Sequence, residues 1–260
     1  CRPSPSIRSF SMCLIVIGWR VHPDYPLVVA ANRDEYYARP SSAIAHWSDA
    51  PQVIGGLDLE AGGTWLGMTD SGRFAAVTNV REPGMAKGAV SRGSLTRNFL
   101  TADMPALAYA EGIEPDRYAG FNLLLTDGES LVYCSNRDGQ PRSLQPGIYG
   151  LSNHLLDSPW PKLLAARQAF AEALPSLPDE SAFFELLANQ QIVPDENLPN
   201  TGVPIAWERL LSAVFVKSES YGTRASTLAW QRRDGCITVH ERSFGPFGQA
   251  LQSSVISTAV

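Results

Sequence analysis

Several signatures of common catalytic and binding proteins are missing from this sequence. The 260-residue chain has no Gly-x-Gly-x-x-Gly after a predicted strand and no Gly-Lys-Ser/Thr, which argues against a phosphate-binding loop. It also lacks the Gly-x-Ser-x-Gly elbow that carries the nucleophile of α/β-hydrolases. Its histidines lack metal-ligand spacing, and no Cys-x-x-Cys-His haem attachment occurs; they are His22, His46, His154 and His240. A catalytic metal and a histidine-activated nucleophile are therefore poorly supported, and we expect no metal and no resident cofactor.

Paired cysteines, long apolar runs and excess positive charge are also absent. The four cysteines, Cys1, Cys13, Cys134 and Cys236, are widely scattered, which argues against a disulfide framework or a zinc site. No apolar run reaches the roughly 18–20 residues that cross a bilayer. The net charge of −5 argues against nucleic acid as a partner. We expect a cytoplasmic protein of the reducing compartment, with no transmembrane segment.

The pattern of predicted elements indicates an α+β fold. Hydrophobic residues make up 44% of the chain and charged residues 18%, as in ordinary globular proteins. Predicted strands outnumber helices, and the helices come in pairs between groups of strands; the main strands are 12–18, 27–31, 73–79, 120–126, 131–134, 213–216, 226–230 and 237–240, and the main helices 161–174 and 179–188. This order of strands and helices is typical of antiparallel sheets that are covered by helices. We assign residues 12–260 to one domain.

Residues 1–11 differ from the rest of the chain, because they lack acidic residues and have no apolar segment of the kind that signal peptides use. We expect them to form a disordered extension or to reflect a misassigned start. The distinction matters because an uncleaved extension would block the amine of Cys13.

The first predicted strand pair brings a cysteine close to charged residues. Residues 12–18 and 27–31 are apolar runs separated by a proline-rich turn, and they predict an antiparallel hairpin. Cys13 opens the first strand and Arg33-Asp34 follows the second, so the thiol and the charged pair become neighbours. A nearby cation favours the thiolate. If Met12 is the true start, its removal leaves an α-amino group on Cys13 with a pKa of roughly 7.7–8.0, suitable for a general base.

Other interpretations of these residues stay open at this point. A cysteine in an apolar strand is commonly a small buried hydrophobe, and Arg-Asp after a strand is commonly a solvated turn. Asn79 and Asn153 follow predicted strands and are also typical of turn caps. Arg224, before the strand at 226–230, is also compatible with a surface ion pair. We expect Cys13 to react faster than Cys134 and Cys236, which we place inside apolar strands.

Six short segments together resemble the NRDE family, which includes the eukaryotic transport-and-Golgi-organisation proteins. They are Met12-Cys13-Leu14-Ile15, 31–35 with Asn32-Arg33-Asp34-Glu35, 62–67, Thr78-Asn79 with Arg81-Glu82, 150–153, and 222–227. The family in turn is similar to the cysteine branch of the N-terminal-nucleophile hydrolases, alongside penicillin V acylases and bile salt hydrolases. This resemblance implies a four-layer αββα sandwich.

The resemblance also implies roles for particular residues. Cys13 is the expected nucleophile with its own amine as base, and Asp34 is expected to hold that amine. Arg33 or Arg224 is expected to stabilise the thiolate. Asn79 is expected to donate to the oxyanion, and Asn153 to complete the polar cluster. The hydrolases space their Arg and Asp apart, whereas here the two are adjacent and point to opposite faces of a strand, so we predict that Asp34 rather than Arg33 faces the thiol.

Two functions follow from these expectations. The first is hydrolysis of an acyl amide, ester or thioester bond of a small molecule by Cys13. The second is binding or trafficking without catalysis, with haem or a lipid or acyl-CoA as ligand, because the resemblance connects eukaryotic members with haem mobilisation, lipid handling and secretory organisation. A fold alone does not decide between them. A purely structural role leaves the polar residues at the strand ends unexplained.

Overall fold

The computed structural model describes residues 12–85 and 88–258, so the predicted extension at 1–11 lies outside the described residues. Its framework is two antiparallel sheets. The six-stranded sheet runs in the order β10 (Gly147–Leu151), β1 (Met12–Trp19), β2 (Leu27–Tyr36), β11 (Tyr221–Gln231), β12 (Ile237–Phe244) and β13 (Ala250–Ser257). The seven-stranded sheet runs in sequence order from β3 (Ala45–His46) through β4 (Val53–Gly55), β5 (Leu66–Thr69), β6 (Phe74–Asn79), β7 (Phe121–Thr126) and β8 (Leu131–Ser135) to β9 (Arg142–Leu144).

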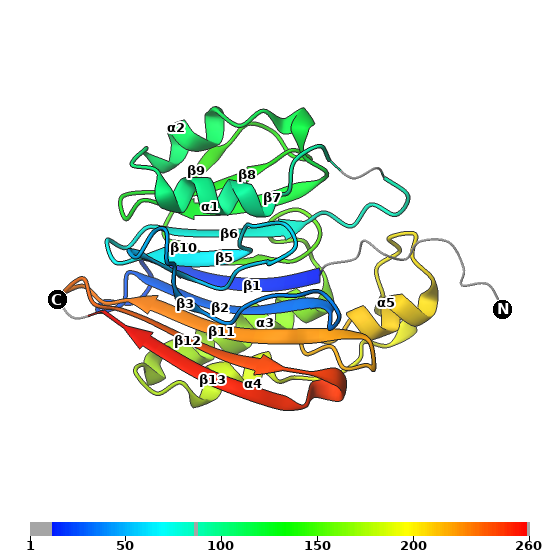
Figure 1. Ribbon diagram of the computed structural model, residues 1–260. Coiled ribbons are helices and arrows are strands. Elements are labelled where there is room, and N and C mark those ends of the chain that lie inside the picture. Colours follow the sequence, from blue (N-terminus) through cyan, green and yellow to red (C-terminus); the bar gives the residue numbers. More distant parts are fainter. Residues whose placement is uncertain (1–11, 86–87, 259–260) are drawn as a thin grey trace.

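Helices cover the outer face of each sheet, as Figure 1 shows. The seven-stranded sheet packs against α1 (Gly93–Thr101) and α2 (Ala106–Glu111), and the six-stranded sheet against α3 (Pro161–Ala173) and α4 (Ser181–Leu187). A further helix, α5 (Ile205–Leu211), lies at the end of the sandwich where β1 begins. The predicted four-layer αββα architecture is confirmed.

The alternation of side chains along β1 and β2 divides the core into layers. Ile15 and Ile17 of β1 face the second sheet, in the same cluster as Val29 and Ala31 of β2. The intervening residues, Leu14, Val16, Val28 and Ala30, face the helices, where they meet Leu163 and Phe170 of α3. Because both faces of these strands are buried, each strand is a nearly continuous apolar run in the sequence. The same alternation decides where the polar residues at the strand ends point.

One predicted strand does not form. Residues 213–216 are apolar and were expected to pair in a sheet, but they make a buried bend after α5. Side chains satisfy its backbone instead: the carbonyl of Val214 accepts from Asn32 Nδ2 at 2.9 Å, and the amide of Val216 donates to Thr223 Oγ1 at 2.9 Å. The apolar residues of this segment correctly predicted that it is buried, but they did not predict its backbone conformation.

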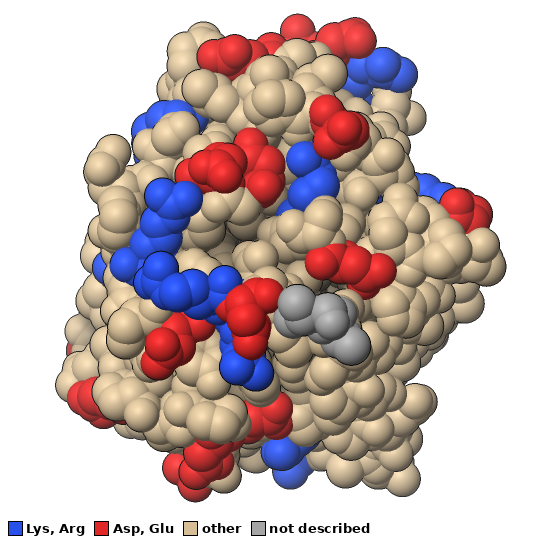
Figure 2. Space-filling view, turned by 90° about the vertical axis from the view of Figure 1, so that its left-hand side faces the viewer, with Lys and Arg blue, Asp and Glu red and all other residues tan. Residues whose placement is uncertain are grey.

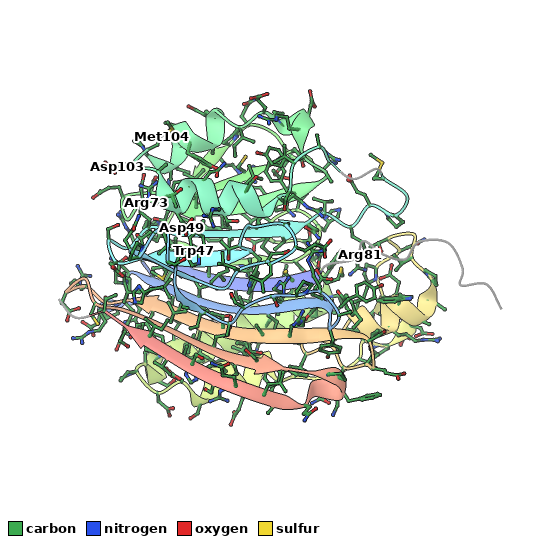
Figure 3. All side chains as sticks on the ribbon, viewed as in Figure 1. Trp47, Asp49, Arg73, Arg81, Asp103 and Met104 are labelled. Atoms are coloured by element: carbon green, nitrogen blue, oxygen red, sulfur yellow. The ribbon has the colours of Figure 1, made fainter. Side chains whose placement is uncertain are left out.

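Figures 2 and 3 show how charged side chains are distributed over the molecule. On the face shown in Figure 2, Lys and Arg side chains lie close to Asp and Glu side chains. Figure 3 places Arg81 at the end where β1 begins, and Trp47, Asp49 and Arg73 toward the opposite end. Within the described part of the chain, no helix is long and apolar enough to cross a membrane.

Candidate active site

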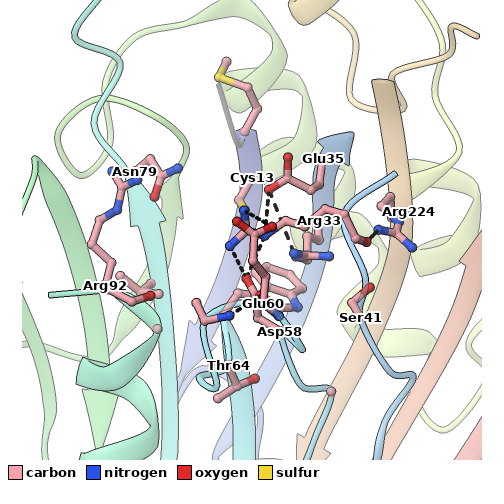
Figure 4. Close-up of a pocket in the computed structure, with 18 of the residues that line it drawn as sticks. Cys13, Arg33, Glu35, Ser41, Asp58, Glu60, Thr64, Asn79, Arg92 and Arg224 are labelled. Atoms are coloured by element: carbon pink, nitrogen blue, oxygen red, sulfur yellow. Dashed lines mark hydrogen bonds and ion pairs between the residues drawn. The ribbon is translucent and has the colours of Figure 1, made fainter. Parts of the chain in front are cut away.

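A cavity of about 800 Å³ opens where β1 begins, with walls from both sheets and from the loops that join them. The six-stranded sheet contributes Cys13, Arg33 and Arg224, and the other side contributes Asn79 at the end of β6 and Arg92 just before α1. Figure 4 shows Cys13 between these two groups of side chains. The pocket therefore gathers four of the six residues predicted from the sequence.

Cys13 is held by hydrogen bonds to its backbone from the turn after β10. Its amide donates to Asn153 Oδ1 at 3.2 Å, and its carbonyl accepts from the Ser152 hydroxyl at 2.9 Å. Asn153 Nδ2 in turn donates to the carbonyl of Asn79 at 2.9 Å. Asn153 is completely buried and does not line the cavity. It joins the start of β1 to the end of β6 and so sets the width of the pocket between Cys13 and Asn79.

The Asn32-Arg33-Asp34-Glu35 segment divides between the two faces of β2. Cys13 pairs with Arg33 across the strands, and Met12 pairs with Asp34. Because β2 continues to Tyr36, the alternation is unbroken: Arg33 and Glu35 line the cavity, and Asp34 points with Met12 toward the helices. The prediction that Asp34 rather than Arg33 faces the thiol was wrong. It was made without the register of the hairpin: residues on opposite strands in direct register share a face, and Arg33 is the partner of Cys13.

Asp34 lies in a buried polar cluster behind the strand. Its Oδ1 accepts from the Thr223 hydroxyl at 2.7 Å, while its Oδ2 is buried without a hydrogen-bond partner. Burial raises the pKa of Asp34, and the ammonium of Lys162 on α3 opposes that rise. Burial likewise lowers the pKa of Lys162, whose Nζ donates to the carbonyl of Leu211 at 2.8 Å. An unpaired buried carboxylate oxygen is costly, so this site favours an additional donor.

The thiol of Cys13 is not activated while Met12 precedes it. Burial raises the pKa of Cys13 to about 12, and the carboxylates of Asp34 and Glu35 act in the same direction. The Arg33 guanidinium lowers this pKa, but by less. The neutral thiol is therefore the dominant form at pH 7. Arg33 thus lowers the pKa of Cys13 as expected, but burial raises that pKa by more.

Arg224 reaches the pocket because of a β-bulge. The pairing of β11 with β2 shifts register between Thr223 and Ala225, so Arg224 is the extra residue. Its Nη1 donates to the carbonyl of Tyr36 at 3.3 Å and also to the carbonyl of Arg39. Bulges are used beside active sites to redirect a side chain. Gly222, two residues before Arg224, leaves no room for a larger side chain, because a Cβ there would lie 2.4 Å from Tyr37 Oη and 2.6 Å from the Val216 carbonyl.

Glu35 and Arg92 also line the pocket, and neither was predicted from the sequence as a site residue. Glu35 is buried; its Oε1 accepts from the Tyr36 amide at 2.8 Å, and its Oε2 lies 4.0 Å from Arg33 Nη2 and 3.8 Å from Arg39 Nε. Counting two residues on from Arg33 along the strand would have placed it on the thiol's face. Arg92 lies in a glycine-rich loop, and no periodic signal in the sequence points to it.

Because Asn32 and Glu35 lie on opposite faces of β2, we expect their substitution to change the free energy of unfolding by different amounts. Asn32 is fully buried, its Nδ2 donates to the carbonyls of Leu187 (2.8 Å) and Val214 (2.9 Å), and its Oδ1 accepts from Ser226. We expect Asn32→Ala to lower the free energy of unfolding by about 2–4 kcal/mol, because two buried carbonyls lose their donor. Glu35→Gln, on the pocket face, should change it by less than about 1 kcal/mol. Urea unfolding of both variants tests this, and equal losses would contradict the assignment of the two faces.

The sequence comparisons identify relatives over most of the chain. The family model described as Transport and Golgi organisation 2 matches residues 12–246. The Bos taurus Transport and Golgi organization protein 2 homolog is 39% identical in an alignment 256 residues long that covers 89% of this chain and 93% of that protein. The Homo sapiens homolog is 37% identical with the same coverage, and the Drosophila melanogaster protein is 30% identical over 84% of this chain and 87% of its own length.

Two solved structures share the fold at low sequence identity. A Caenorhabditis elegans ortholog of N-acylethanolamine-hydrolyzing acid amidase has a TM-score of 0.50 at 14% identity, over 83% of this chain and 92% of that one. A mutant of the conjugated bile acid hydrolase from Clostridium perfringens has a TM-score of 0.53 at 10% identity, over 96% and 92% of the two chains. At such identities the likeness establishes the fold, which is that of the N-terminal-nucleophile hydrolases.

Proposed function

The chain belongs to the Transport and Golgi organisation 2 family, and from its fold and pocket we propose that it is an N-terminal cysteine hydrolase of acyl amide, ester or thioester bonds. The observation that supports this most is the place of Cys13: it begins the first strand, and its side chain faces a cavity of about 800 Å³ with Arg33 paired opposite it. A nucleophile with a cation beside it in a cavity suits the transfer of an acyl group from a small-molecule substrate to the protein.

The proposal requires a base for the thiol, and removal of Met12 supplies one. A thiol with a pKa of about 12 needs a proton acceptor before it can attack. Without Met12, the nitrogen of Cys13 becomes an amine attached to the residue that carries the thiol. Met12 pairs with Asp34, whose Oδ2 has no partner, so the new amine would lie next to an acceptor that the present chain leaves unused. Asp34 would then hold the amine, although its side chain faces away from the sulfur.

The reaction then proceeds in two balanced steps. The amine takes the thiol proton, the sulfur bonds to the acyl carbon, and the leaving group departs with the proton from the ammonium. Water next loses a proton to the amine and attacks the thioester, which releases the acid and restores the thiol. Arg33 would stabilise the thiolate, and the side-chain amide of Asn79 would donate to the oxyanion.

Thiol labelling tests the requirement for a free amine. In the chain with Met12, Cys13 and Cys134 are buried with raised pKa values, whereas Cys236 is half-exposed in the turn before β12 rather than inside a strand as predicted. Limiting iodoacetamide should therefore label Cys236 before Cys13 and Cys134. In a chain that begins at Cys13 the order should reverse, because the amine deprotonates the thiol beside it. Peptide mass mapping gives the order, and slow labelling of Cys13 in both chains would count against the hydrolase.

Binding without turnover is the second candidate, and the raised pKa of Cys13 favours it. An inert thiol in a cavity of about 800 Å³ suits a carrier, with haem or an acyl lipid as ligand. Titration of haem and of an acyl lipid into the wild type and the Cys13→Ser variant separates the two functions. Tight binding that survives the substitution, without turnover of any acyl compound by the wild type, would favour the carrier. The cytoplasm remains the predicted location for either function.

A further inference from the structure

Five arginines and five acidic residues line the described pocket, but not every one of these arginines is paired with a carboxylate. Arg39 is paired with Asp58 at 2.8 Å, and it also contacts Glu35 and Glu60. Arg33 contacts Glu35 at 4.0 Å. Among the residues that the structure describes, Arg92 and Arg224 on the pocket wall form no ion pair with any carboxylate. Arg224 is committed to two backbone carbonyls and Arg33 lies beside Glu35, so Arg92 is the wall arginine that has neither a carboxylate nor a second carbonyl as partner.

The guanidinium of Arg92 is fixed in place and remains charged. Its Nη1 donates to the carbonyl of Gly120 at 3.0 Å, which is the hydrogen bond that orients it. Burial lowers the pKa of Arg92 to about 10, opposed by the nearby Cys13 and Glu35, so the group is protonated at neutral pH. A guanidinium has five N–H donors, and one such bond leaves the others for a ligand.

Two of the acidic residues on the pocket wall, Glu82 and Glu35, already have other arginines as partners. Arg137 holds Glu82 through two bonds, Nε to Oε1 at 2.5 Å and Nη2 to Oε2 at 2.9 Å. Glu35 faces Arg33 and Arg39. A half-buried cation on a cavity wall without a carboxylate of its own is a costly arrangement that a bound anion relieves.

The position of Arg92 relates it to the reacting atoms. Figure 4 shows Arg92 and Asn79 together on one side of Cys13, with Arg33 and Arg224 on the other. Arg92 and Cys13 line the same cavity. A substrate whose acyl carbon lies at the sulfur can therefore extend an anionic group to Arg92 within the same cavity.

We propose that Arg92 binds a carboxylate or phosphate group that the substrate carries close to its acyl carbon, so that the substrates are anionic acyl compounds. This rests on the proposed hydrolase function and names its substrate class. Both oxyanions match the planar donors of a guanidinium, and the experiment distinguishes them. Arg92 then selects substrates by charge and leaves the bond-breaking steps to Cys13.

The test compares substrates that differ in one charge: an N-acylglycine, the matching N-acyl-2-aminoethyl phosphate, and the neutral N-acylglycinamide. Wild type with Cys13 exposed should hydrolyse at least one anionic compound about ten- to a hundredfold faster, in kcat/KM, than the neutral one. Arg92→Gln should bring that ratio close to one, and Arg92→Lys should retain part of it. Arg97→Gln, on α1 outside the pocket and paired with Asp49, is the matched control and should keep the ratio of the wild type.

A binding measurement keeps this inference separate from the hydrolase proposal. In full-length Cys13→Ala protein, calorimetry should show the N-acylglycine or the phosphate binding about tenfold or more tightly than the amide, and Arg92→Gln should abolish that difference. Equal binding of charged and neutral compounds, or an equal loss of both in Arg92→Gln, overturns the role of Arg92 even if the wild type hydrolyses acyl compounds. If charge-dependent binding appears without any turnover, the hydrolase proposal fails and the anion site stands.

Discussion

Replacing Cys13 by alanine should abolish acyl hydrolysis, with a loss of at least about 10⁴-fold in kcat for the best substrate found. The reason is that no other thiol lies in the described pocket: Cys134 is buried in β8 and Cys236 lies in the turn before β12. Loss of a covalent nucleophile forces direct attack by water, and removal of nucleophiles in comparable enzymes costs about 10⁶ in kcat. Release of product from a panel of acyl amides, esters and thioesters measures the effect.

Two comparisons make this result specific. Cys134→Ala removes a buried thiol outside the pocket and should leave kcat within about threefold, although the cavity that it creates lowers stability. Cys13→Ser keeps the shape of the side chain and should still lose most activity, since a hydroxyl is a weaker nucleophile than a thiol at neutral pH. If Cys13→Ala protein hydrolysed these compounds as fast as the wild type, the assignment of the nucleophile would be wrong.

Exposing the amine of Cys13 should raise activity by about 10²–10⁴-fold, the usual contribution of a positioned general base. Two chains cut from one fusion protein provide the comparison, one beginning at Met12 and one at Cys13, each verified by intact mass. Both carry a terminal amine, but only in the second is it attached to the residue that bears the thiol. Met12 is 1% exposed and packs with Leu211, Val216 and Tyr221, so its loss also removes apolar contacts, and unfolding of both chains must be measured alongside activity.

The pH dependence gives this comparison a second readout. The base must be neutral to accept the thiol proton, so the rate of the chain beginning at Cys13 should rise as the amine deprotonates. An unperturbed α-amine has a pKa of roughly 7.7–8.0, and a nearby Asp34 carboxylate moves it upward. The chain beginning at Met12 should rise only toward the thiol pKa of about 12. Equal activity and identical pH profiles for the two chains would rule out the amine as base.

Much of the fold was determined by local sequence patterns. The apolar runs at 12–18 and 27–31 with a proline-rich turn between them predicted β1 and β2, although not the register that pairs Cys13 with Arg33. The helix periodicity over 161–174 predicted α3. These predictions succeed because a strand or helix with a buried face must repeat apolar residues at its own period. The resemblance to a known family supplied the four-layer arrangement, which periodicity alone does not specify.

The tertiary structure decided what periodicity could not. It showed that β2 runs on to Tyr36, which sends Arg33 and Glu35 into the cavity and Asp34 behind it. It showed the bulge that brings Arg224 to the wall, and the loop that places Arg92 near Cys13. It also showed that burial outweighs the Arg33 charge at the thiol. Each of these depends on groups far apart in the chain, because burial and field at an atom are sums over its neighbours in space, and the sequence alone determines only which residues are available to become those neighbours.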